Sequence, residues 1–270
     1  MAFKIIVCAK QVPDTNVIKI NPKTGTLIRD GVPSILNNDD ANALEEALRI
    51  KDKHPDTTVT VITMGPPQAK DLLLECLAMG ADEGILVSDR AVGGSDTWAT
   101  SNTLEAAVNR WVKENGPYDL IFAGRQAIDG DTAQVGPQLA EKLALPQVTY
   151  VEAFSISEDL KDITVRRQME DGYEVITLKT PCLLTTIKEL NTPRYMNLVN
   201  VFGDAESRIK VWNAKDIEVD LSKVGLEASP TNVFRSFTPA PKGKGQILEG
   251  DTEREVAEKL LISLKAKHVI

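Results

Sequence analysis

Hydrophobic and polar positions in the first half of the chain follow two alternating patterns. Short runs rich in apolar and β-branched residues predict strands at residues 3–9, 57–63, 84–88 and 118–123. Between these runs, apolar residues recur every three or four positions and predict helices at residues 41–53, 67–79, 97–114 and 132–144. Strands that alternate with helices are typical of a doubly wound, mostly parallel α/β sheet with helices on both faces.

The pattern becomes rich in β-like segments after Pro146. These segments lie at residues 147–154, 162–168, 173–179 and 182–187, and they either widen the same sheet or form a small antiparallel layer. Residues 16–31 contain two further β-like pieces around a turn-forming Asn-Pro-Lys-Thr-Gly sequence. We therefore expect a hairpin there, inserted before the first helix.

The C-terminal part of the chain differs from the rest. From Leu226 it is irregular and rich in proline, and residues 253–267 then show an amphipathic helical pattern. A helix at the end of such an arm either docks on another protein or folds back on its own domain, and the sequence favours neither outcome. We therefore expect an α/β domain at residues 1–225 and a C-terminal arm ending in a helix at residues 226–270.

Composition and charge exclude several classes of protein. The formal net charge of −8 argues against nucleic acid as the main partner, because phosphate binding needs a basic face. Every apolar run falls well short of the roughly 20 residues that span a bilayer, so we expect no membrane insertion. The chain passes from Met1 directly into its first β-like segment without the pattern of a signal peptide, which predicts a cytoplasmic protein.

Cysteine and histidine are too few and too scattered for several kinds of site. Cys8, Cys76 and Cys182 are isolated and odd in number, which argues against a disulfide framework and against a CxxC motif. The two histidines, His54 and His268, leave little material for a Ser-His-Asp triad or a His-rich metal site. We therefore expect no metal centre.

The loops that follow the predicted strands are where a ligand is expected. In a doubly wound sheet, ligands bind outside the carboxyl ends of the strands. The loops there are residues 8–15, 64–67, 88–97 and 124–137, and each contains small residues or a backbone-breaking residue that lets a bulky group approach the main chain. The last of them, GRQAIDGDTAQVGP, has three glycines in a strand-to-helix turn.

The 124–137 loop lacks the lysine of a standard phosphate-binding loop. The backbone N–H groups at a helix start bind phosphate without one. Asp131 and Gln134 have the spacing of a capping box, and Asp96 or Ser95 can cap the helix that starts at residue 97. Asp129 and Asp131 would repel phosphate. We expect them to cap backbone or to bind ribose hydroxyls or the adenine amino group, and a purely structural role in the turn stays equally open.

A second group of capping residues, Asn37-Asn38-Asp39-Asp40, stands at the entry to the first helix, with the same two interpretations. The chain contains neither GxGxxG nor GxxxxGK[ST], which excludes a standard NAD fingerprint and a P-loop. The residues by themselves therefore predict a Rossmann-like α/β protein that holds a nucleotide without hydrolysing it.

Five segments resemble the β (small) subunit of electron-transfer flavoproteins, and the resemblance covers nearly the whole chain. They are VCAKQVPDT at residues 7–15, NNDDANALEEALR at 37–49, CLAMGAD at 76–82, GRQAIDGD at 124–131 and LNTPRY at 190–195. The family often has a proline where this chain has Asn38. The resemblance implies an α/β heterodimer in which the α subunit carries an electron-transferring FAD and this subunit holds an adenine nucleotide.

The resemblance also bears on which nucleotide is held. In housekeeping members it is a structural AMP, whereas in flavin-based bifurcating members it is a second FAD that takes hydride from NADH and splits the electron pair. Segments that resemble the bifurcating group are GGSDTWATS at residues 93–101, GDTAQVGP at 130–137 and SPTNVFRSFTP at 229–239. They imply FAD in this chain, with ferredoxin and the FAD of the α subunit as electron acceptors. The alternatives are the AMP-binding carrier and a stand-alone adenine-nucleotide-binding protein.

The matched loops supply the expected nucleotide contacts. These are Cys8, Ala9, Lys10, Asn37, Asn38, Asp39, Asp40, Met64, Gly65, Asp96, Thr97, Thr100, Gly124, Arg125, Gln126, Asp129, Gly130, Asp131, Thr132, Ala133, Gln134 and Val135. No side chain is expected to be catalytic, because a flavin carries the chemistry itself. Arg125, the only cation of its loop, is a candidate for stabilising either the pyrophosphate or the negative charge of a reduced flavin.

The resemblance further implies a surface for a dehydrogenase, most often an acyl-CoA dehydrogenase. It maps onto residues 190–201, where Leu198 is the apolar anchor and Arg194 and Tyr195 lie beside it. An ordinary β-to-α connection is the alternative, since a single exposed leucine means little. The arm at residues 226–270 is expected to contact the α subunit.

Overall fold

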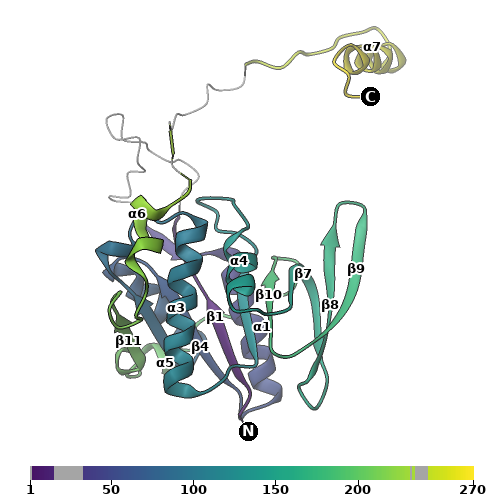
Figure 1. Cartoon of the computed structure of the whole chain (residues 1–270). Coiled ribbons are helices and arrows are strands. Elements are labelled where there is room, and N and C mark those ends of the chain that lie inside the picture. The colour runs from purple at the N-terminus through teal and green to yellow at the C-terminus, as the bar shows by residue number, and fades with distance from the viewer. Residues whose placement is uncertain (1, 15–32, 232, 235–242) are drawn as a thin grey trace. The chain divides into compact units, whose positions relative to one another are not determined.

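The computed structural model describes residues 2–14, 33–231, 233–234 and 243–270 (Figure 1). The described residues up to Phe234 belong to one compact unit, and those from 243 to 270 belong to a second. The hairpin expected at 16–31 lies outside the described residues. The segments before and after it, β2 (Gln11–Pro13) and β3 (Ser34–Leu36), pair with each other antiparallel.

A nine-stranded sheet forms the centre of the first unit, within the described part of the chain (Figure 1). Its strand order is β11-β5-β4-β1-β6-β10-β7-β8-β9. The strands that pair in parallel are β1 (Lys4–Cys8), β4 (Thr58–Met64), β5 (Glu83–Val87), β6 (Leu120–Gly124), β7 (Gln147–Ile156), β10 (Cys182–Thr186) and β11 (Ile209–Trp212). Antiparallel pairing adds β8 (Asp162–Met169) and β9 (Gly172–Lys179) at one edge. The doubly wound, mostly parallel α/β sheet is confirmed.

The segments after Pro146 widen the same sheet and do not form a separate layer. β10 pairs with β6, β7 pairs with β10, and the β8–β9 hairpin continues from β7 (Figure 1). The opposite edge strand, β11, was not predicted. It is only four residues long, and two of them are exposed, so its apolar pattern is too short to stand out.

The helices mostly match the predicted ranges. They are α1 (Asn38–Lys53), α2 (Lys70–Met79), α3 (Thr97–Asn115), α4 (Val135–Lys142), α5 (Leu198–Val201), α6 (Gly225–Ala228) and, in the second unit, α7 (Glu253–Ala266). Short 3-10 helices lie at Pro67–Ala69, Arg90–Val92, Glu206–Arg208 and Leu221–Lys223. The start of α4 is three residues later than predicted. This start puts Pro137 in the first turn, where a backbone N–H has no partner within the helix and its loss costs nothing.

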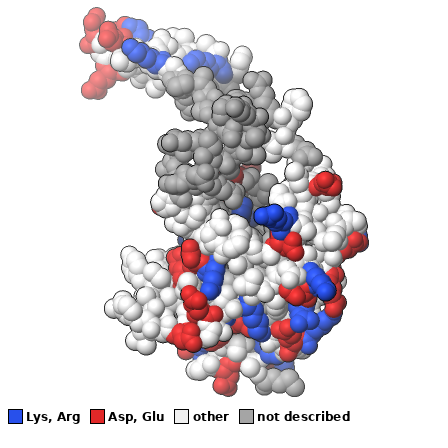
Figure 2. Space-filling view, turned by 90° about the vertical axis from the view of Figure 1, so that its left-hand side faces the viewer, with Lys and Arg blue, Asp and Glu red and all other residues white. Residues whose placement is uncertain are grey.

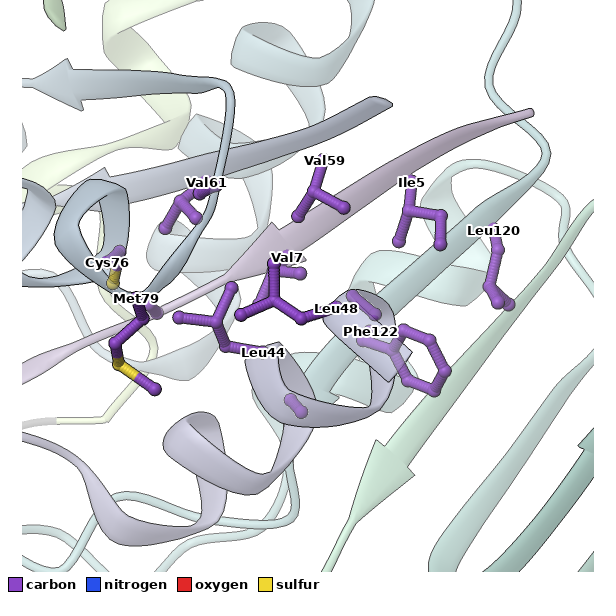
Figure 3. Close-up of a cluster of buried hydrophobic side chains, with 14 of the residues drawn as sticks. Ile5, Val7, Leu44, Leu48, Val59, Val61, Cys76, Met79, Leu120 and Phe122 are labelled. Atoms are coloured by element: carbon purple, nitrogen blue, oxygen red, sulfur yellow. The ribbon is translucent and has the colours of Figure 1, made fainter. Parts of the chain in front are cut away.

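Two hydrophobic clusters cover the two faces of the sheet. Side chains alternate along β1, so Ile5 and Val7 face the cluster that includes α1 and α2, while Ile6 and Cys8 face the cluster that includes α3 and α4. Figure 3 shows Leu44 and Leu48 of α1 beside Ile5 and Val7. Burial of these two leucines contributes about 3–6 kcal/mol, which holds α1 on the sheet and fixes where its first turn lies.

The path of the chain places a crevice at one point of the sheet. From β1 the chain crosses by α1 to β4 and then reaches β5 on one side, and it returns by α3 to β6, on the other side of β1. The connections therefore leave β1 and β6 in opposite directions. The space outside the carboxyl ends of such a strand pair is where doubly wound sheets bind their ligands.

Candidate functional site

One buried carboxylate links the two loops at this crevice. Asp40, in the first turn of α1, accepts hydrogen bonds from the backbone N–H of Lys10 after β1 and of Gly124 at the end of β6, each at 2.8 Å. Burial raises the pKa of Asp40 to about 7, although the two N–H donors act in the opposite direction. Asp40 therefore fixes the spacing of the two loops from inside the protein.

Gly124 is required because α1 comes so close to it. A Cβ at this position would lie 2.3 Å from Asp40 Oδ1 and 2.7 Å from the backbone nitrogen of Asp40. Both distances are far below van der Waals contact. The first glycine of the 124–137 loop thus allows the start of α1 to pack on the end of β6.

Asn37 makes a second link, which the prediction of a capping cluster missed. It occupies the N-cap position of α1, but its side chain caps no N–H of that helix. Instead, Asn37 Nδ2 donates to the Gln126 carbonyl at 2.9 Å and Asn37 Oδ1 accepts from the Ile128 N–H at 3.1 Å. Asn38 then begins the helix at the position where proline is common, so α1 starts there without the proline of the family.

The charged side chains of the loops pair with one another. Lys10 Nζ lies 2.6 Å from Asp129 Oδ1, which joins the loops after β1 and β6. Asp131 Oδ1 accepts a hydrogen bond from Gln126 Nε2 at 2.8 Å. The two aspartates of the loop therefore accept hydrogen bonds from neighbouring side chains of the loops.

Arg125 differs, because its guanidinium is only partly satisfied. Its Nε is buried and has no hydrogen-bond partner among the described residues, and the nearest carboxylate oxygen, Asp39 Oδ2, is 3.4 Å away. Its Cζ lies 5.4 Å from the centre of the Tyr150 ring. Burial raises the pKa of Asp39, and the positive charge of Arg125 opposes that shift. Because part of the Arg125 side chain is exposed, the terminal nitrogens of its guanidinium are the atoms that can donate to an anion.

The start of α4 offers a row of backbone donors. The predicted capping box is wrong, because Gln134 is the N-cap and makes no capping hydrogen bond, while Asp131 turns away with a φ of 50°. Within the part of the chain that the structure describes, the N–H groups of residues 132–136 have no acceptor. Free N–H groups at a helix start bind phosphate oxygens, and they do so best when no side chain caps them.

The start of α3 lies beside the start of α4. Thr97 Oγ1 donates to Gln134 Oε1 at 3.0 Å. Asp96 is the N-cap of α3, as one of the two predictions had it, and accepts a hydrogen bond from the Ala99 N–H at 3.0 Å. Ser95, the alternative, does not cap this helix, because its hydroxyl donates to the Val92 carbonyl. The loops after β5 and β6 therefore meet at two adjoining helix starts.

Residues just after α6 complete this part of the site, and the candidate list did not contain them. The Asp96 N–H donates to Ser229 Oγ at 2.8 Å, and the Thr231 N–H donates to Asp96 Oδ2 at 2.9 Å. Gly225, at a φ of 78°, lets α6 approach the Ala91 carbonyl, which a Cβ there would meet at 2.3 Å. No local spacing signals these contacts, since more than 130 residues separate the partners.

The expected contact residues thus fall into two groups. Residues of the loops after β1, β5 and β6 are brought together by the contacts above, and Gly65 of the loop after β4 bonds to the Val87 carbonyl beside them. The side chain of Cys8, in contrast, lies in the core, where burial raises the pKa of its thiol to about 12. Thr100 lies one turn into α3, and its N–H bonds to the Asp96 carbonyl.

The expected docking residues lie elsewhere, on the loop after β10. Leu198 begins α5 and is 71% exposed, and Tyr195 is 97% exposed. Arg194 instead binds carboxylates of α1. A groove of about 730 Å³ runs along the outer side of α3 and is lined by residues such as Trp98, Asn102, Lys142 and Lys223.

Charges on the face of the molecule next to β11 are mixed. Figure 2 shows Lys and Arg side chains interspersed with Asp and Glu, without a continuous basic surface on this face. Among the described residues, every helix is too short or too polar to cross a membrane, and His, Cys, Asp and Glu form no group suited to a metal ion.

Known proteins match this chain over nearly its whole length. The family described as electron transfer flavoprotein domain matches residues 24–217. The caffeyl-CoA reductase-Etf complex subunit CarD of Acetobacterium woodii is 61% identical over 99% of this chain and 100% of its own length. The electron transfer flavoprotein subunit beta of Clostridium acetobutylicum is 54% identical, and the acryloyl-CoA reductase electron transfer subunit gamma of Anaerotignum propionicum is 48% identical, each over 99% of this chain and its own full length. The crevice, the sheet and these matches agree that the chain belongs to the electron transfer flavoprotein family, as a β subunit.

Proposed function

We propose that this chain is the β subunit of a bifurcating electron-transfer flavoprotein. FAD bound in its crevice supplies the chemistry, accepting hydride from NADH and dividing the electron pair between ferredoxin and the FAD of the α subunit. The α subunit in turn serves a dehydrogenase of the acyl-CoA type. Two relatives support this partner, since their names refer to caffeyl-CoA reductase and acryloyl-CoA reductase.

The row of free N–H groups at the start of α4 carries the proposal. The backbone N–H groups of residues 132–136 have no acceptor among the described residues, and Arg125, whose side chain is partly exposed, adds one cation. A diphosphate needs several donors and little side-chain charge when a helix start supplies the field. These residues therefore fit the diphosphate of FAD, and they also fit the phosphate of AMP.

The surroundings of Asp96 favour the larger nucleotide. Ser229 and Thr231 bond to Asp96 and hold the segment after α6 against the start of α3, which lies beside the start of α4. The segments that hold these residues, 93–101 and 229–239, are those that resemble the bifurcating group. That resemblance, at residues that meet beside the crevice, supports FAD.

The residues of the chain have distinct tasks in this proposal. Asp40 and Asn37 hold the loops after β1 and β6 at a fixed spacing. The N–H groups at the start of α4 bind phosphate, and Arg125 neutralises part of its charge. Lys10 and Asp129 join the two loops through their ion pair. The Lys10 ammonium can donate to the phosphates, and the Asp129 carboxylate can accept from ribose hydroxyls.

The nucleotide content of the purified heterodimer tests the proposal. After denaturation, the released nucleotides are separated by chromatography and counted per heterodimer. We expect two FAD and no AMP. One FAD with one AMP would establish the housekeeping carrier instead, and a chain that purifies with an adenine nucleotide but without the α subunit or flavin absorbance would establish a stand-alone nucleotide-binding protein.

A further inference from the structure

Exposed apolar side chains are concentrated just after the strand β10. Tyr195, Leu198, Val199 and Phe202 are each at least 71% exposed, and Met196 is half exposed. Such a concentration on a folded surface marks a contact with another protein. The segment has little structure of its own beyond the four-residue helix α5, so something else must hold it in place.

Polar residues of α1 hold the base of this segment. Asn42 Nδ2 donates to the carbonyl and to the side-chain oxygen of Asn191, at 2.8 and 2.9 Å. Asn191 Nδ2 donates in return to the Asn42 carbonyl and to Glu46 Oε2, both at 3.0 Å. Asn42 and Glu46 are buried, so these bonds are shielded from competing water.

Arg194 makes the strongest part of the attachment. Its Nε donates to Glu45 Oε2 at 2.8 Å, its backbone N–H donates to the same oxygen at 3.1 Å, and its Nη2 donates to Asp52 Oδ2 at 2.7 Å. The two carboxylates raise the pKa of the guanidinium above its ordinary value. Glu45 is buried, so if Arg194 left it to bind a partner protein, a carboxylate inside the protein would lose its main cation.

The far end of the segment is attached to α2. The Asn197 N–H donates to the Ala78 carbonyl at 2.9 Å, and Asn200 Nδ2 donates to the same carbonyl at 3.3 Å. The exposed apolar side chains therefore lie between two fixed points. Holding them in this way before a partner arrives lowers the entropy that binding would cost.

We propose that Arg194 and Glu45 form a positioning clamp that holds the 190–201 loop in the conformation that docks on the dehydrogenase, and that Arg194 does not itself contact that partner. The inference rests on the proposed function, and it assigns Arg194 a different role from that of Leu198 and Tyr195. The partner that we propose for this loop is a dehydrogenase of the acyl-CoA type, because two relatives of this chain carry the names of CoA reductases.

Arg49 offers a matched control for the clamp. Its Nε lies 3.1 Å from Glu45 Oε1, so it pairs with the same carboxylate as Arg194, but it belongs to α1 and makes no bond to the loop. Arg49→Gln therefore removes the same charge from the same cluster and leaves the loop attached. The bonds of Asp40 lie more than one turn away on α1, so nucleotide content should not change in either variant.

The test measures electron transfer from the flavin-loaded heterodimer to the dehydrogenase. Arg194→Gln should raise the KM for the dehydrogenase about tenfold, because ordering of the loop then has to accompany binding. The kcat at saturating dehydrogenase and the flavin content should stay at the wild-type values. Arg194→Lys should bring the KM only part of the way back to the wild-type value, since a single ammonium cannot reach both carboxylates. An equal KM for Arg194→Gln and Arg49→Gln would overturn the clamp.

Two further measurements separate positioning from direct contact. Hydrogen exchange of residues 190–202 in the free heterodimer should speed up in Arg194→Gln and not in Arg49→Gln, and unchanged exchange would overturn the clamp. In a double-mutant cycle, Glu45→Gln should add little to Arg194→Gln, whereas independent, additive effects would assign Arg194 to the dehydrogenase interface. Leu198→Ala tests the docking role itself. If this variant transfers electrons to the dehydrogenase at the wild-type rate, the docking surface is no longer part of the proposed function, whatever the results for the Arg194 and Arg49 variants.

Discussion

The close approach of α1 to β6 makes Gly124 the most sensitive position of the crevice. In Gly124→Ala, the new methyl group would lie 2.3 Å from Asp40 Oδ1 and 2.7 Å from the Asp40 backbone nitrogen. Contact distances of at least about 3.4 Å require a shift of about 1 Å between α1 and β6. That shift also stretches the 2.8 Å bond from the Gly124 N–H to Asp40.

The expected cost combines two effects. Overpacking of this kind costs about 1–3 kcal/mol, and weakening a hydrogen bond to a charged group costs about 1.5–3 kcal/mol. Gly124→Ala should therefore lower the free energy of unfolding by about 2.5–6 kcal/mol. It should also release the nucleotide of this chain, because the loops after β1 and β6 lose their fixed spacing.

Gly130→Ala is the matched control, since a Cβ there meets nothing within 4 Å. Urea unfolding is compared for the two variants in the heterodimer, and the nucleotide retained after gel filtration is compared between Gly124→Ala and the wild type. Gly130→Ala should stay within about 0.5 kcal/mol of the wild type. If Gly124→Ala also stays within that range and keeps its nucleotide, the link through Asp40 does not organise the crevice.

Three other predictions concern the crevice and the arm. Burial raises the pKa of Asp40 from 3.8 to about 7, so protonation favours the folded state. In urea unfolding, the stability of the wild type relative to Asp40→Asn should therefore fall by up to about 4 kcal/mol as pH rises from 4 to 7, and a constant difference would refute the assignment. Arg125→Gln should weaken retention of this chain's nucleotide about tenfold in equilibrium dialysis and leave the FAD of the α subunit in place, whereas equal retention would remove Arg125 from the site. Truncation after Phe234 should weaken assembly with the α subunit in gel filtration while the contacts of Asp96 with Ser229 and Thr231 keep the first unit folded, and unchanged assembly would exclude a docking role for the arm.

Regular patterns of the sequence were enough to predict the fold. The strands β1, β4, β5 and β6 lie within a few residues of their predicted ranges, because buried parallel strands form continuous apolar runs. The short edge strand β11 escaped prediction for the opposite reason, since it is buried only in part. The start of α4 was misplaced because Asp131 and Gln134 have the spacing of a capping box, yet Asp131 adopts a left-handed backbone conformation that directs it toward Gln126.

The loops that form the candidate site could be predicted from the sequence, but the contacts that hold these loops together could not. The four loops could be named from topology alone, because parallel strands end at one edge of the sheet. Asn37 and Asp40 looked like capping residues from their neighbours in sequence. Their partners, Gly124 and Ile128, are 84 and 91 residues away, and local spacing carries no signal of such distant contacts. The bonds of Ser229 to Asp96 and of Arg194 to Glu45 were missed for the same reason.

Anaerobic titration of the purified heterodimer with NADH distinguishes a reactive flavin in this chain from a nucleotide held for structure. The absorbance of both flavins is followed, first alone and then with ferredoxin, the dehydrogenase and its acceptor present. We expect NADH to bleach flavin absorbance and ferredoxin to become reduced only when the dehydrogenase can turn over. A heterodimer whose flavin spectrum is unchanged by NADH would contradict this expectation and would show that this chain holds its nucleotide for structure alone.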